Sequence, residues 1–327
     1  MLTTPMDVMT QFPVRKSKKQ KQAFRDAVQS YVTELGYISS VEKGGFGSQN
    51  LVIGEPEKAK YLVTAHYDTC ARMPIPNLIT PCGFFAFLGY QFFVCIMLLV
   101  EALFLGVILS FVLGTVCTLM GDPFAEAITI SIVFFPVYAF FFGMPICAAL
   151  MIIGPANKNN ANDNTSGVIT LLEIARTLPE NQRHKVCFVL FDLEEAGLIG
   201  SASYRKIHKK ETDQQLILNL DCVGEGDHLI MLPTKKLKKD RKKLTSLYKA
   251  CGYFGSKSVT VREKGFAVYP SDQGNFPFGV GICALKPSKF GLYLGRIHTP
   301  RDTILEETNI NILRAALTTF ICCDAAQ

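Results

Sequence analysis

The 327-residue sequence predicts a three-layer α/β domain that is interrupted by a two-helix transmembrane hairpin. Short apolar runs alternate with helical stretches in the first and last parts of the chain, which is the rhythm of an α/β fold. This rhythm stops after Arg72 and resumes near Lys158, and no Lys or Arg lies between these two residues. Hydrophobic residues make up 49% of the chain, which is high for a water-soluble enzyme.

The first part of the chain predicts a helix followed by two strands. From residue 18 to 35 apolar side chains recur at three- and four-residue spacing, which is typical of an amphipathic helix, and Gly36 ends it. The runs 50–53 and 61–66 have the composition of strands, and the second of them continues into polar residues. An α/β enzyme sheet commonly begins in this way.

Two almost wholly apolar stretches follow, residues 84–120 and 124–153, with Gly121-Asp122-Pro123 as a turn between them. Each exceeds the ~20 residues that a helix needs to cross a bilayer. A buried hairpin in a soluble protein is the alternative, but helices that are apolar on every face have no side for water. We therefore assign residues 80–153 to a transmembrane hairpin that contacts the lipid bilayer through residues 84–153.

The α/β pattern resumes after the hairpin, so residues 1–79 and 154–327 form one discontinuous domain. Its predicted strands cover residues 185–191, 216–220, 229–232 and 279–285, and its predicted helices cover residues 166–178, 198–209, 237–251 and 309–322. Without the hairpin, the chain is still long enough to bury a single substantial core.

Charge and cysteine usage narrow the choice of partners and compartment. The formal charge of +6 is concentrated in short basic runs, which favours contact with anionic lipid headgroups only weakly and gives nucleic acid no better support. The eleven cysteines are an odd number with no C-x-x-C motif, so we expect free thiols in a reducing compartment. The N-terminal residues lack the apolar core of a signal peptide, so export by that route is not expected.

Acidic and imidazole side chains follow several predicted strands, where the site of an α/β enzyme usually lies. His66 and Asp68 are two residues apart at a strand end, so both project to the same side. Asp68 is placed to hold the second ring nitrogen of a metal-bound His66. Asp163 precedes a predicted helix, and taken singly it is better explained as a helix cap.

The strongest signal is FDLEEAGLIGS (residues 191–201), where a buried strand delivers three acids within four residues. Crowded acids repel one another unless cations neutralise them, although the N-terminus of a following helix also attracts acids. Asp221 ends another apolar strand, and His298 lies in a late loop. Five such coincidences in order favour a hydrolytic site with two metal ions, which needs these ligand types and a free carboxylate as base.

At these motifs the chain resembles the zinc exopeptidases that include bacterial leucyl aminopeptidase, aminopeptidase Y and glutamate carboxypeptidase. The matching segments run from Thr64 to Thr303 in the same order, and they are TAHYDT, NDNTSG, FDLEEAGLIGS, NLD and RIHTPRDT. The resemblance implies a three-layer peptidase domain with a mixed sheet and two Zn²⁺ ions per chain.

The resemblance also implies a role for each residue. Five residues would bind zinc: Asp163 as the bridge between the ions, His66 and Asp221 at one ion, and Glu195 and His298 at the other. Glu194 would be the general base, Asp68 would orient His66, and Asp192 would be structural. This chain has Gln273 where the family often has His. Because this position is not an inferred metal ligand, the departure bears on substrate contacts rather than on metal binding.

The predicted reaction is hydrolysis of a peptide bond by a metal-bound hydroxide, with Glu194 as the base. The family favours an aminopeptidase, and a carboxypeptidase is left open. A non-peptide amidohydrolase or cyclase on the same fold is left open too, as is a catalytically inactive membrane receptor or scaffold. The expected partner is a peptide substrate, nucleic acid is not expected, and a homo-oligomer is left open.

The topology of the hairpin follows from a parity argument. Ligands that precede the hairpin and ligands that follow it must reach the same site, so the chain crosses the membrane an even number of times. Basic residues flank the hairpin, whereas its connecting turn carries only the acids Asp122 and Glu126. The positive-inside rule then predicts an integral cell membrane protein with two transmembrane helices and a cytoplasmic catalytic domain.

Overall fold

A computed structural model describes residues 2–73, 77–121, 123, 126, 129, 132–135, 137, 139–289 and 291–323. The chain divides into two compact units. The first, called here the α/β unit, comprises Met1–Phe84 and Ala156–Gln327, and the second, the hairpin unit, comprises Phe85–Pro155. These divisions lie a few residues from the predicted boundaries.

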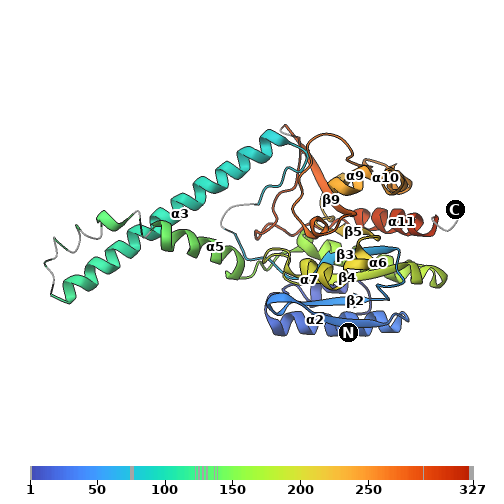
Figure 1. Cartoon of the computed structure of the whole chain (residues 1–327), viewed down its shortest axis with the longest axis horizontal. Helices are drawn as coiled ribbons and strands as arrows, with labels where there is room; N and C mark the ends of the chain where they lie inside the picture. Colours follow the sequence, from blue (N-terminus) through green and yellow to red (C-terminus); the bar gives the residue numbers. More distant parts are fainter. Residues whose placement is uncertain are drawn as a thin grey trace. The chain divides into compact units, whose positions relative to one another are not determined.

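Among the described residues, a mixed sheet of ten strands forms the centre of the α/β unit (Figure 1). Along the sheet the order is β1-β2-β4-β3-β5-β9-β6-β8-β7, and β10 pairs with β9. The predicted fold class, an α/β domain with a mixed sheet, is confirmed. The strands are β1 (Ser39–Lys43), β2 (Gln49–Ile53), β3 (Tyr61–His66), β4 (Val186–Phe191), β5 (Leu216–Leu220), β6 (His228–Pro233), β7 (Gly252–Phe254), β8 (Lys257–Val261), β9 (Gly279–Ser288) and β10 (Gly291–Tyr293).

The central strands β4, β3, β5 and β9 run parallel and are covered on both faces. Even-numbered residues of β4 pack into one apolar cluster, and odd-numbered residues pack into a second cluster on the other face. Strands that are buried on both sides have continuous apolar sequences. This is why these strands stand out in the sequence.

Helices on the two faces complete the three layers. Side chains of α2, α6 and α11 share the larger cluster with the sheet, for example Phe24, Leu171 and Leu313, whereas α7 packs on the opposite face through Tyr204. The helices of this unit are α1 (Asp7–Gln11), α2 (Lys18–Glu34), α6 (Gly167–Thr177), α7 (Ile199–Ile207), α8 (Lys209–Thr212), α9 (Lys235–Lys239), α10 (Arg241–Leu247) and α11 (Glu307–Cys323).

The single helix predicted over residues 237–251 is wrong. The chain instead forms α9, α10 and a 3-10 turn over Tyr248–Ala250. Asp240 separates the two helices with a non-helical backbone, and its side chain accepts a hydrogen bond from the backbone N–H of Lys243. An Asp in this position caps the following helix and ends the preceding one.

The hairpin unit contains α3 (Phe84–Leu119) and a second apolar helix over Ile132–Ile153, and both are long and apolar enough to cross a membrane. Residues 136 and 138 of the second helix, like Asp122 of the predicted turn, lie outside the described residues. A π-helical turn over Ala139–Gly143 precedes α5 (Met144–Ile153). Because core helices of soluble proteins can meet the same criterion, length and composition support the predicted membrane hairpin only weakly.

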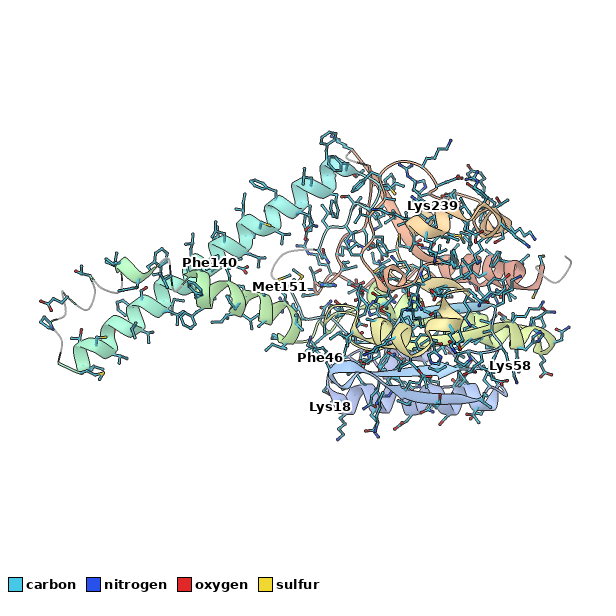
Figure 2. All side chains as sticks on the ribbon, viewed as in Figure 1. Lys18, Phe46, Lys58, Phe140, Met151 and Lys239 are labelled. Atoms are coloured by element: carbon cyan, nitrogen blue, oxygen red, sulfur yellow. The ribbon has the colours of Figure 1, made fainter. Side chains whose placement is uncertain are left out.

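Small residues allow the two helices of the hairpin unit to approach closely. The buried residues of α3 lie at four-residue spacing: Ala102, Gly106, Ser110 and Gly114. A Cβ atom on Gly143 of the second helix would lie 2.7 Å from the carbonyl oxygen of Ala102. Small residues at this spacing are typical of helix pairs in lipid. Large apolar side chains such as Phe140, labelled in Figure 2, are exposed instead.

Candidate metal centre

The parallel strands bring the predicted site residues to one edge of the sheet. His66 is the last residue of β3, Asp221 directly follows β5, and the acidic segment 192–195 follows β4. Since β3 lies between β4 and β5 in parallel register, the three strand ends meet. Asp163 lies in the turn over Ala161–Ser166, where its own backbone is not helical (φ −111°, ψ 97°), and His298 lies in the loop before α11.

The carboxylate of Asp163 lies between the two histidines. Its Oδ1 is 3.3 Å from Nε2 of His66, and its Oδ2 is 3.0 Å from Nε2 of His298. Nε2 of His66 also lies 3.6 Å from Oδ1 of Asp221, and Nε2 of His298 lies 3.2 Å from Oε2 of Glu195. All five predicted ligands therefore lie in one cluster, in two sets that share Asp163.

The cluster has the properties of a cation site. Ligand atoms of His66, Asp163 and Glu195 lie within 4.8 Å of one another, and so do those of His66, Glu194 and Asp221. Oε1 of Glu195 and Oδ1 of Asp221 are buried, and neither has a hydrogen-bond partner among the described residues. Buried carboxylate oxygens without donors are costly unless a cation binds them. Carboxylate and imidazole groups of this kind fit zinc.

The pKa shifts of the acids in the cluster also favour a cation site. Burial raises the pKa of Glu194 and of Glu195 well above the ordinary carboxyl value, and repulsion from neighbouring acids adds to this effect. Burial also acts to raise the pKa of Asp163, but hydrogen bonds from His298 and His66 outweigh it and hold this pKa below its ordinary value. The cluster therefore contains more buried acids than its two imidazoles can balance, and a divalent cation would compensate them.

Asp68 connects the end of β3 to the acidic segment. One of its oxygens accepts a hydrogen bond from the backbone N–H of Glu194 at 3.1 Å, and the other accepts one from that of Glu195 at 3.3 Å. Oδ1 of Asp68 also lies 3.5 Å from Nδ1 of His66. Asp68 is thus placed to fix the acids and the imidazole relative to one another, as carboxylates behind metal-binding histidines commonly do.

Asp192 has the contacts of a structural residue. It forms a buried ion pair of 2.7 Å with Lys21 of α2, and it accepts hydrogen bonds from the backbone N–H groups of Gln49 and Leu193. These bonds tie the acidic segment to β2 and α2. The partners of Asp192 therefore all lie outside the metal cluster, whereas Glu194 and Glu195 belong to that cluster.

Several residues near the cluster were missed by sequence reasoning. Asp302 is buried and accepts hydrogen bonds from the backbone N–H groups of Asn162 and Asp163 at 2.8 and 3.0 Å, and burial raises its pKa to about 8. The thiol of Cys70 lies within 4.8 Å of ligand atoms of Glu195 and His298. No spacing motif marks Cys70, and Asp302 could have been found only as the acidic position of the RIHTPRDT segment.

Gln273 supports the strand that carries a ligand. Its side-chain oxygen accepts a hydrogen bond from Asn219 at 3.0 Å, and its amide donates to the carbonyl of Tyr269 at 2.7 Å. The hydroxyl of Tyr269 in turn donates to the carbonyl of Asp221 at 3.1 Å. The side chain of Gln273 is buried, so the departure from His bears on packing beneath Asp221.

Several solved structures share this fold. LapA aminopeptidase of Legionella pneumophila is 15% identical over 99% of this chain and 72% of that chain, with a TM-score of 0.55. Glutaminyl cyclase of Porphyromonas gingivalis is 15% identical over 96% and 94%, with a TM-score of 0.51. A Zn-dependent exopeptidase of Parabacteroides distasonis is 14% identical over 95% and 92%, with a TM-score of 0.51. At these identities the likeness concerns the fold alone.

Sequence comparison identifies the family. No curated protein matches the chain in sequence. The model of Peptidase family M28, however, matches residues 149–320, which is more than half of the chain. The matched region contains Asp163, Glu195, Asp221 and His298, whereas His66 lies before the hairpin and outside it. The chain belongs to peptidase family M28.

Proposed function

We propose that this protein is a membrane-anchored zinc aminopeptidase that binds two Zn²⁺ ions per chain. The observation that carries the proposal is the position of Asp163, whose two carboxylate oxygens each face a different histidine. His66 and Asp221 would hold one ion, and Glu195 and His298 the other, with Asp163 shared. Bound zinc would supply a Lewis acid and an activated water for hydrolysis of an amide bond.

Glu194 is our candidate for the general base. It lies beside His66 and Asp221 but is not needed to complete either proposed ligand set. Burial raises the pKa of its carboxyl group, which makes it a stronger base than an ordinary carboxylate. Asp68 holds its backbone N–H. Glu194 would accept the proton of the attacking water and return it to the leaving amine.

Membership in family M28 supports a peptidase, and the fold shared with LapA aminopeptidase supports the choice of the amino-terminal end. The fold shared with a glutaminyl cyclase keeps cyclisation of an amino-terminal glutamine as the second candidate. The ligand arrangement favours the peptidase, because it provides for two ions that share Asp163.

We expect a peptide with free ends to be cleaved from its amino terminus by the purified full-length protein. Acetylation of the amino end should abolish cleavage, because an aminopeptidase binds the free amine, whereas amidation of the carboxyl end should have little effect. Mass spectrometry of the products measures the effect of each end modification on cleavage. The reverse pattern would indicate a carboxypeptidase, and ammonia release from an amino-terminal glutamine without peptide cleavage would indicate a cyclase.

We also propose that the α/β unit faces the cytoplasm. Cysteines placed at exposed Gly121 and at exposed Lys158, after replacement of the exposed native cysteines Cys95 and Cys323, report the two sides. An impermeant thiol reagent applied to intact cells should label position 121 only, and both positions should react once the membrane is disrupted. Labelling of position 158 in intact cells would reverse the orientation.

A third position tests the number of crossings. Arg72 is exposed and precedes the hairpin, so a cysteine there should behave like one at position 158. Labelling of only one of these two positions in intact cells would contradict an even number of crossings. Lys158 is preferred to the neighbouring Asn157 as the position for the cysteine. The side chain of Asn157 is buried and donates hydrogen bonds to the carbonyls of Asn159 and Thr299.

A further inference from the structure

Positive charge is concentrated on one part of the α/β unit. Residues 235–243 (KKLKKDRKK, α9 and the start of α10) and residues 262–268 (REKGFAV, after β8) are called here the basic rim. They hold nine basic and two acidic side chains, a formal surplus of seven, against a surplus of six for the whole chain. The rest of the protein therefore has no net positive charge.

Most of these cations have no acidic partner within the protein. Asp240 pairs with Lys243, and Glu263 pairs with Arg241. Among the described residues, no carboxylate forms an ion pair with the remaining rim cations, and most of them are exposed. Unpaired surface cations repel one another, so the folded chain retains this cluster at an electrostatic cost that bound anions would relieve.

The basic rim directly adjoins the point where α3 begins. The backbone N–H of Val268 donates to the carbonyl of Pro81 at 2.9 Å, and the ring of Phe266 lies 5.2 Å from that of Phe84, the first residue of α3. The ion pair between Arg241 and Glu263 joins α10 to the same loop. Lys238 and Arg262 are close enough to act electrostatically on the thiol of Cys82.

From this position we propose that the basic rim binds the anionic phospholipid headgroups of the leaflet that α3 enters. The inference rests on the membrane anchoring proposed above, because a helix that enters the bilayer at Phe84 brings the headgroup layer close to residues 81–84. Clusters of four to eight basic residues beside a membrane helix commonly bind anionic lipid. Because the rim and α3 belong to the same chain, a helix anchored in the bilayer also keeps the headgroups at a high effective concentration near the rim.

The side chains of the rim fit a lipid surface better than a defined soluble ligand. Seven of the nine cations are lysines, which act as flexible point charges and suit a mobile layer of headgroups, whereas arginine is preferred for fixed bidentate contacts. Phe266 and Val268 accompany them at the end of the rim that contacts residues 81–84. Aromatic and apolar side chains beside lysines are typical of membrane interfaces.

Amine-reactive footprinting tests the proposal without use of catalytic activity. The full-length protein is placed in nanodiscs of phosphatidylcholine, with or without phosphatidylglycerol, and acetylation of each lysine is followed by mass spectrometry. We expect Lys235, Lys236, Lys239 and Lys242 to react several-fold more slowly when phosphatidylglycerol is present, and high salt to remove the difference. Lys18 and Lys19 of α2, which are also exposed, are the control and should not change. Figure 2 labels Lys239 and Lys18 on opposite sides of the α/β unit.

Four results would overturn the proposal. Equal rates in both lipids, or equal protection of Lys18 and Lys19, would exclude a specific headgroup surface. Protection that requires added DNA or polyphosphate and is absent with phosphatidylglycerol would assign the rim to a soluble polyanion. Failure of the chain to co-purify with nanodiscs would overturn membrane anchoring and this inference together, and it would leave the peptidase proposal to the peptide assay.

Discussion

Replacement of Glu194 by Gln is expected to lower kcat by about 10²–10⁴-fold, which is the usual contribution of a general base. The amide keeps the shape of the side chain, but its oxygen is too weak a base to accept the proton of water. Because Glu194 is not one of the proposed ligands, the variant should retain both zinc ions. Initial rates on an unblocked peptide, with zinc measured by atomic emission on the same preparation, provide the test.

Glu195→Gln is the matched comparison for this prediction. It makes the same chemical change one residue later, at a side chain that lies 3.2 Å from His298. Here we expect loss of zinc, and activity that partly returns when zinc is added in excess. If instead Glu194→Gln lost zinc and Glu195→Gln kept it, the roles of the two neighbouring acids would have to be exchanged.

The sequence predicts the central part of the sheet well, because β3, β4 and β5 are buried on both faces and their apolar runs are continuous. The strands at the edges, β1 and β7, were not predicted. Their exposed and half-buried residues, such as those of Ser39–Lys43, give no apolar run. Pairing with a neighbouring strand, which local sequence does not show, makes them strands.

For the metal centre, the residues that directly follow buried strands were the easiest to find. His66 and Asp221 meet because β3 and β5 are parallel neighbours, and an apolar run that ends in a polar group indicates such a position. Asp163 and His298 lie outside the strands, and their roles came only from the family resemblance. Their distances to the other ligands depend on how distant loops meet, which spacing along the chain does not determine.

Of the residues that hold the ligands from behind, Asp68 was part of the predicted site because it lies two residues after His66, whereas Asp302 was not predicted. Asp302 accepts hydrogen bonds from the backbone N–H groups of Asn162 and Asp163, which lie more than a hundred residues earlier in the chain. The short stripe of small residues in α3 was likewise overlooked within a long apolar segment, although it determines how closely the two hairpin helices approach. Composition showed where a helix lies, and three-dimensional packing was needed to show which of its faces is buried.

Replacement of Asp163 by Asn is expected to remove activity more completely than any other single change in the cluster. The side chain faces both histidines, with oxygens at 3.3 and 3.0 Å from their Nε2 atoms. In the amide one of these oxygens becomes an NH₂ group, which is a donor and does not bind zinc. Both proposed ion sites lose a charged ligand, so zinc should fall from about two ions per chain to less than one after dialysis, as expected when a shared ligand is lost.

Asp192→Asn separates this effect from the general cost of removing a buried carboxylate. Asp192 is buried and paired with Lys21 rather than with the cluster, so its variant should keep both zinc ions while its melting temperature falls, because Lys21 loses its buried partner. Zinc analysis and thermal unfolding of the two variants distinguish the cases. An Asp163→Asn protein that retained two zinc ions would exclude the bridge, and one that lost a single ion while the other remained tightly bound would make Asp163 a ligand of one site only.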